Sequence, residues 1–187
     1  VSDASDSGNL KYVEKQYLGG GELVHIGTTS GTSSVSAVNI NDIFTSAYDT
    51  YKVFGTILVD TNGATVRMLY NKASGSTVAN ASSYKYILSA EQLHSNGSTE
   101  GGTNGSGLGV AYVELAYNMD TDSTYAPFVF EMNFYDPLQS FASYQWFDGR
   151  LTFYEQNNKF GHGTIGGQYR ENFNATGLKF TVSSGNI

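Results

Sequence analysis

The sequence contains no cysteine, which excludes disulfide bonds and thiolate metal sites. The 187-residue chain must therefore be stabilised by its own hydrophobic core or by neighbouring subunits. Only two prolines occur beside 22 glycines, a composition that favours many tight turns. A chain of this length predicts one domain, with an arm as the only addition.

Positive charge is also scarce, with 10 Lys and Arg against 17 Asp and Glu and a net charge of −7. Nucleic-acid-binding proteins neutralise phosphates with clustered cations, so we expect no nucleic-acid partner. No apolar run approaches the roughly 20 residues that span a bilayer. The polar start VSDASDSGN lacks the basic and apolar regions of a signal peptide, and the missing initiator Met suggests processing or a longer parent chain.

The common catalytic motifs are missing as well: the sequence has no GxSxG, Walker A or HExxH pattern. Residues 161–166, GHGTIG, match GxGxxG in letters, but no helix pattern follows them. Asp120 and Asp122 are the candidate Ca²⁺ ligands, although the alternative is a polar turn because Ca²⁺ usually takes about 6–8 oxygens. No carboxylate pair stands out for glycoside hydrolysis. We expect no cofactor and no catalytic residue.

Aromatic residues are plentiful, with 14 Tyr and 11 Phe, and they favour β-strands. The stretch 44–70 shows the clearest alternation, and Asn62-Gly63 predicts a tight turn that folds it into a hairpin. The face predicted to be buried carries Ile57, Val59, Val66 and Met68. The opposite, solvent-facing side carries Lys52, Asp60, Thr65 and Arg67.

Further strands are predicted from alternation and turn signals. They cover 22–26, 34–40, 84–88, 110–117, 128–135 and 178–182, and those at 110–117 and 128–135 are expected to pair. Single helical turns are expected at 41–47 and 89–94, a mobile Gly/Ser-rich loop at 95–109 and an irregular stretch at 155–174. The pattern predicts an all-β, antiparallel β-sandwich, jelly-roll-like, with about nine or ten strands.

We expect two parts: an N-terminal arm with a glycine hinge at 1–21, carrying Tyr12 and Tyr17 as contact residues, and one sandwich domain at 22–187.

A second hairpin is predicted over 141–154, with its turn at Asp148-Gly149. Its register places Trp146 in the core with Tyr144, Leu151 and Phe153, which disfavours the alternative that Trp146 stacks on a sugar. Phe147 and Arg150 then face outward as an exposed cation–π pair.

Residues 33–71 and 177–187 carry a resemblance. The signals are the Ser/Val-rich lead-in, the YDTYK core at 48–52, the RMLYN strand end and the closing KF strand followed by SSGN. Together they resemble a β-rich module of tailed-bacteriophage virion proteins, especially those of marine and cyanobacterial phages. The resemblance implies a tail fibre, head fibre or decoration protein, often trimeric and without catalytic residues. In such modules a further strand follows SSGNI, so the resemblance predicts an unpaired edge near Lys179 and Thr181 that pairs with a neighbour.

The resemblance thus implies a non-enzymatic virion structural protein, located on the particle surface, that assembles as a homotrimer and contacts other virion proteins. The alternative is a receptor- or carbohydrate-binding module that grips a host glycan with the 95–109 loop and Phe147. A third hypothesis is a polysaccharide-degrading enzyme, which the lack of a distinct carboxylate pair disfavours. A membrane-inserted protein is not expected.

Overall fold

The computed structural model describes residues 24–30, 34–72, 83–121, 127–138, 144–156, 158–171 and 174–187. The predicted arm at 1–21 and the candidate ligand Asp122 lie outside these residues.

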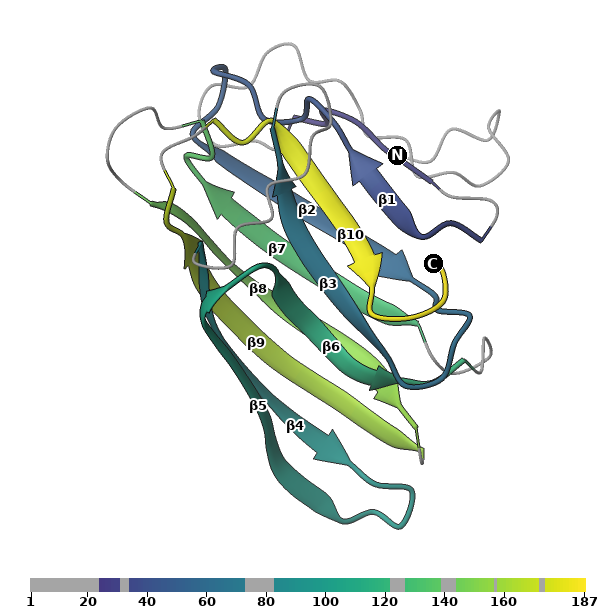
Figure 1. The fold of residues 1–187 in the computed structure, drawn as a ribbon. Helices are drawn as coiled ribbons and strands as arrows, with labels where there is room; N and C mark the ends of the chain where they lie inside the picture. Colours follow the sequence, from purple (N-terminus) through teal and green to yellow (C-terminus); the bar gives the residue numbers. More distant parts are fainter. Residues whose placement is uncertain are drawn as a thin grey trace.

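The described residues form ten strands joined by turns and irregular segments (Figure 1). In chain order they are β1 (Ala37–Ile40), β2 (Thr50–Ile57), β3 (Ala64–Asn71), β4 (Tyr84–Leu93), β5 (Thr99–Val110), β6 (Val113–Met119), β7 (Phe128–Tyr135), β8 (Gln145–Glu155), β9 (Lys159–Tyr169) and β10 (Gly177–Val182). Each strand pair is antiparallel, and the sheet is not closed into a barrel. The all-β antiparallel prediction is confirmed. No helix long and apolar enough to cross a membrane occurs in the described ranges.

The sheet has two parts that meet through a single residue pair, Met119 with Glu155. The four-strand part runs β1-β10-β3-β6, and the six-strand part runs β2-β7-β8-β9-β4-β5. In Figure 1 the four-strand part lies in front of much of the six-strand part. Aromatic rings fill the space between them: Phe180 of β10 lies 5.0 Å from Phe130 of β7 between ring centroids. The two parts therefore bury their apolar faces against each other.

The strand pairing predicted for the hairpin over 44–70 is wrong, whereas the face predicted to be buried is buried. Thr65 and Arg67 of the predicted solvent face are half-buried. The turn exists, since the Ala64 N–H donates to the Thr61 carbonyl oxygen at 3.3 Å and Gly63 has a φ of 80°. However, β2 pairs with β7, whereas β3 pairs with β10 and β6. The turn thus carries the chain from the six-strand part to the four-strand part. The four side chains expected in the core are buried.

The second predicted hairpin is wrong, because β8 runs straight through Asp148-Gly149. Gly149 faces Met132 of β7, and a Cβ at this glycine would lie 2.5 Å from the Glu131 carbonyl oxygen. A continuous strand keeps odd-numbered residues on one face, whereas a turn at 148–149 would have changed the parity. Phe147 is consequently 2% exposed and Trp146 is 54% exposed, the reverse of the prediction.

The predicted loop at 95–109 and the irregular stretch at 155–174 are mostly strand, in β5 and β9. Several of their glycines lie against aromatic rings. A Cβ on Gly107 would lie 2.4 Å from Tyr86 Cε1, and one on Gly161 would lie 2.5 Å from Phe153 Cε2. These glycines mark close approach rather than mobility. The GHGTIG run lies inside β9, which is no setting for a nucleotide loop.

Three smaller predictions also fail. Strands β6 and β7 do not pair with each other, because β6 pairs with β3 and β7 with β2 and β8. Residues 24–26 of the strand expected at 22–26 are not in a strand, and residues 22 and 23 lie outside the described ranges. No helical turn forms at 41–47, and residues 89–93 belong to β4.

The predicted unpaired edge at 178–182 is also wrong, because β10 lies between β1 and β3. Lys179 and Thr181 are therefore half-buried interior positions of the sheet. The last residues are also paired: Val35 and Ile187 exchange two backbone hydrogen bonds of 3.1 and 2.8 Å. Among the described strands, β1 is the free edge of this part.

Asp60 holds the C-terminal segment against the turn after β2. Its Oδ1 accepts the backbone N–H of Asn186 at 2.7 Å, and its Oδ2 accepts the Asn186 side-chain amide at 3.0 Å. These bonds, with those from Thr61 and Ser34, lower the pKa of Asp60 from 3.8 to about 2.

The Asp60 carboxyl should titrate near pH 2 in an NMR experiment on the folded protein. Because this pKa is depressed, the Asp60 contacts contribute stability above pH 3.8 and lose it as the pH falls through about 2. In Asn186→Ala the pKa should rise part of the way to 3.8, because the backbone bond remains. A wild-type midpoint near 3.8 would show that the C-terminal segment is not held there.

Two adjacent glycines of β9 should respond differently to alanine. A Cβ on Gly167 would lie 2.4 Å from Phe147 Cζ and 2.5 Å from the Lys85 carbonyl oxygen, whereas one on Gly166 would meet nothing within 4 Å. We expect Gly167→Ala to lower the free energy of unfolding by about 1–3 kcal/mol. The control, Gly166→Ala, should change it by less than about 0.5 kcal/mol. Equal urea midpoints for the two variants would contradict the packing described.

Candidate functional site: an apolar groove between edge strands

Strands β1 and β2 are edges of their respective parts, since among the described strands β1 pairs with β10 alone and β2 with β7 alone. Side chains between them line two adjoining hollows of about 280 and 470 Å³. The hollows share Thr29, Ile40 and Phe54, so they form one continuous groove. We call it the edge groove.

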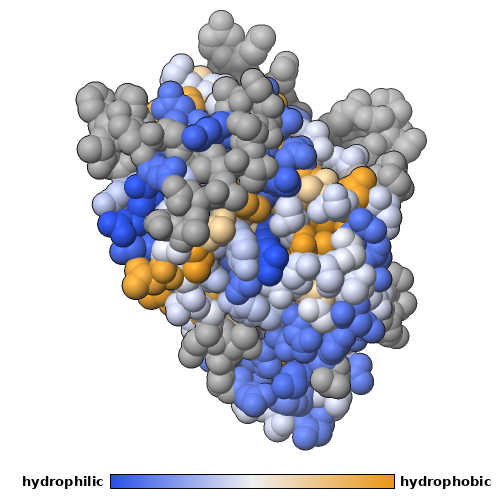
Figure 2. Space-filling view, in the orientation of Figure 1, coloured by the Kyte–Doolittle hydropathy of each residue, from blue (hydrophilic) through white to orange (hydrophobic). Residues whose placement is uncertain are grey.

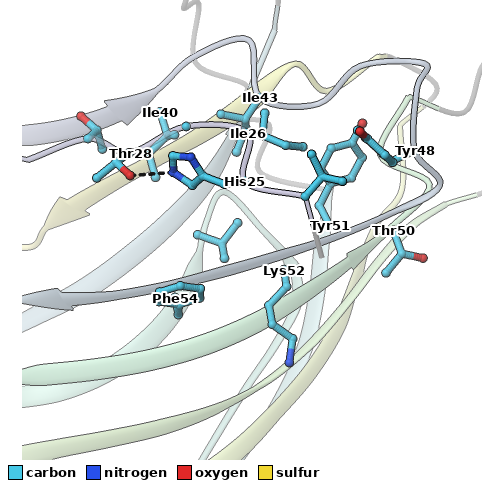
Figure 3. Close-up of a pocket in the computed structure, with 14 residues that line it drawn as sticks. His25, Ile26, Thr28, Ile40, Ile43, Tyr48, Thr50, Tyr51, Lys52 and Phe54 are labelled. Carbon is cyan, nitrogen blue, oxygen red and sulfur yellow. Dashed lines mark hydrogen bonds between the residues drawn. The ribbon is translucent and has the colours of Figure 1, made fainter. Parts of the chain in front are cut away.

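Residues 24–29 line the first hollow together with β2 and the segment after β1 (Figure 3). Figure 3 shows Ile26, Ile40 and Ile43 gathered over β2, with the Lys52 side chain pointing away. Apolar side chains thus dominate this end of the groove.

Tyr51 forms a fixed wall of the first hollow. Its hydroxyl accepts the Thr45 N–H at 2.8 Å and donates to the Thr45 carbonyl oxygen. Its ring lies edge-on to those of Phe44 and Tyr48, with centroids 4.9 and 6.1 Å away. Bonds and ring contacts together hold the segment after β1 in place.

The second hollow reaches down to the core. Gly55 has no side chain to fill the space above the Phe130 ring. A Cβ at this position would lie only 3.0 Å from that ring. Phe180 and Ile187 line the far wall. Two lining residues are exposed: Phe54, on the same side of β2 as Lys52, is 57% exposed and Leu58 is 47% exposed. Figure 2 shows further apolar surface over β1 and neighbouring β10.

The charged groups beside the groove are already paired. Lys52 Nζ lies 2.6 Å from Glu131 Oε1 on β7, and this hydrogen bond lowers the pKa of Glu131. His25 Nε2 lies 2.9 Å from Thr28 Oγ1, as the dashed line in Figure 3 shows. The groove therefore suits apolar side chains better than a charged ligand.

The residues predicted as contact sites do not meet at one place. Phe147 is buried and Arg150 is exposed on the opposite face of β8, so they form no cation–π pair. Asp120 belongs to no group of three or more His, Cys, Asp and Glu side chains that could hold a metal ion in the described ranges. Tyr12, Tyr17 and Asp122 lie outside those ranges.

Sequence reasoning missed the groove, although β2 carried one signal for it. Phe54 falls on the same side of the strand as Lys52, the side expected to face solvent. A large apolar residue in such a position often marks a contact surface.

The chain was compared with known proteins: no family model matches it, and neither does any curated protein or solved structure.

Replacing Tyr51 by Phe should lower the free energy of unfolding by about 1–3 kcal/mol, because the Thr45 N–H and carbonyl lose their partner. The matched control is Tyr48→Phe, in which the side chain is 42% exposed and the loss should stay below about 0.5 kcal/mol. Thermal or urea unfolding measures both. If the two variants unfold alike, the Tyr51 hydroxyl does not stabilise this wall.

Proposed function

We propose that the chain is a non-enzymatic structural subunit of a bacteriophage particle, either an exposed fibre or a decoration protein, that assembles with copies of itself. The edge groove is the observation that supports this proposal most directly. Apolar side chains from two edge strands line it, and the lining residues Phe54 and Leu58 expose about half of their surface. An apolar cleft between free sheet edges is typical of an assembly contact.

The resemblance to phage virion modules supports the same proposal. The two resembling stretches, 33–71 and 177–187, supply β1, β2, β3 and β10. Three of these strands, β1, β10 and β3, are consecutive in the sheet. The Asp60–Asn186 hydrogen bonds also join the two stretches. Segments distant in the sequence thus build one structural unit, and that unit contributes both walls of the edge groove.

We propose that a second copy of this chain occupies the groove. The net charge of −7 makes copies repel one another, so they must meet over surface without unpaired charge. The groove offers such surface, because Lys52 and Glu131 beside it neutralise each other.

The shared aromatic core between the two parts of the sheet supports a sandwich architecture for this subunit. The jelly-roll connectivity stays a prediction. We place the protein on the particle surface, with other virion proteins as further partners; a homotrimer is the oligomer that the resemblance implies.

The double variant Phe54→Ser and Leu58→Ser should weaken self-association by about ten-fold or more, since each apolar side chain contributes roughly 1.5 kcal/mol or more when buried. Sedimentation velocity and native mass spectrometry measure the oligomer. The control is Leu108→Ser on β5, which removes an apolar side chain that is 77% exposed at the opposite edge. A wild-type chain that stays monomeric and binds no other virion protein would contradict the proposal.

A further inference from the structure

The outer face of the six-strand part presents an aromatic platform. Trp146, the sole tryptophan of the sequence, is 54% exposed near the start of β8. Tyr135 of β7 lies opposite it on one side and is 39% exposed. Gln168 of β9 lies opposite on the other side and is half-buried. Trp146 is therefore flanked by an aromatic and an amide side chain on one face of the sheet.

A carboxylate is held in place beside the platform. Asp148, two residues after Trp146 on the same face, accepts the Asn133 amide at 2.6 Å on Oδ1 and the Tyr135 hydroxyl at 2.8 Å on Oδ2. The bond to Asp148 raises the pKa of Tyr135, so this hydroxyl stays a proton donor. Each carboxylate oxygen can accept a second hydrogen bond, which leaves Asp148 able to bind hydroxyl groups.

Open space adjoins Asp148 on the next strand. Gly166 of β9 pairs with Asp148, and a Cβ there would meet nothing within 4 Å. Beyond it, Ile87 of β4 is 69% exposed. Four neighbouring strands about 4.8 Å apart give this surface a width of roughly 14 Å, room for more than one sugar ring.

We propose that this face, built by Trp146, Tyr135, Asp148 and Asn133 beside Gly166, binds a neutral oligosaccharide. A hexose ring has an apolar C–H face that packs on an aromatic ring and a rim of hydroxyl groups that both donate and accept. Trp146 supplies the ring, Asp148 accepts from the hydroxyls, and Asn133 and Gln168 supply amide groups. Gly166 leaves the space that the sugar occupies.

The side chains on this face favour a neutral sugar over two other ligands, an acidic sugar and a protein partner. An acidic sugar that packs on Trp146 would meet the Asp148 carboxylate two residues away on the same face, so we propose a neutral ligand; Lys85 of β4 and Arg150 of β8 are cations on this face. A protein partner would favour a continuous apolar patch with few charges at its centre, whereas here a polar side chain stands beside each aromatic ring.

The experiment titrates the full chain with neutral trisaccharides of glucose, galactose, mannose and N-acetylglucosamine, at up to millimolar concentration. Tryptophan fluorescence reports directly on the site, because Trp146 is its only source. Calorimetry then compares variants: Trp146→Ala and Gly166→Val, which fills the open space, should each weaken binding by about ten-fold or more. Phe160→Ala, which removes another exposed ring from the outer face of β9, should bind as the wild type does.

Saturable binding to at least one neutral sugar, lost in Trp146→Ala and Gly166→Val and kept in Phe160→Ala, is the expected result. Absence of binding to all of them, binding of acidic sugars alone, or equal affinity of all variants would each overturn the proposal. Sedimentation velocity on Trp146→Ala separates it from the assembly proposal, since an oligomer that dissociates in this variant would make the face a subunit interface instead.

Discussion

The fold depends on the aromatic packing between the two parts of the sheet, at whose centre lies Tyr70 of β3. Its N–H donates to the Tyr84 hydroxyl of β4 at 2.7 Å, so a main-chain group of one part is satisfied by a side chain of the other. The Tyr70 ring lies 5.8 Å from those of both Phe134 and Tyr169, between centroids. The chain has no disulfides, and among the described strands the two parts share only the Met119–Glu155 strand pairing, so this contact is a main determinant of how they pack on each other.

Local sequence patterns predicted burial better than pairing, for a physical reason. Alternation determines which side chains face the core, whereas a strand's partner depends on contacts between distant residues. The two turn signals show the difference. Gly63 has a positive φ and forms a real turn, whereas Gly149 is a glycine because Glu131 and Met132 leave no space for a Cβ. The two dipeptides look alike in the sequence. In the same way, the sequence does not show that Gly105, Gly107, Gly161 and Gly167 make room for aromatic rings rather than forming loops.

The candidate sites were mispredicted for the same reason: strand partners and turns could not be determined from local sequence patterns. A single wrong turn at 148–149 changed the parity of β8 and exchanged the expected environments of Trp146 and Phe147. The edge groove could not be predicted from the sequence, because it forms only where β1 and β2 are edge strands. Which strands are edges depends on the topology of the whole sheet. What the sequence did predict was the all-β class and the burial of Ile57, Val59, Val66 and Met68.

The two surfaces occupy different places on the sheet, and this separation has a consequence for binding. Trp146 lies on β8, two strands in from the edge strand β2, and its side chain projects from the flat outer face. Phe54 of the edge groove projects from the same outer face, but it lies on β2 opposite Glu131. Copies whose contacts stay on β1 and β2 would leave Trp146 uncovered on each subunit. A shallow face would engage few sugar atoms, so each proposed sugar site would bind weakly. If several such sites were held in one oligomer, they would act together, because avidity can raise the combined affinity by about 10²–10⁴ without any new contact. Assembly at the groove would then determine how strongly the outer faces bind.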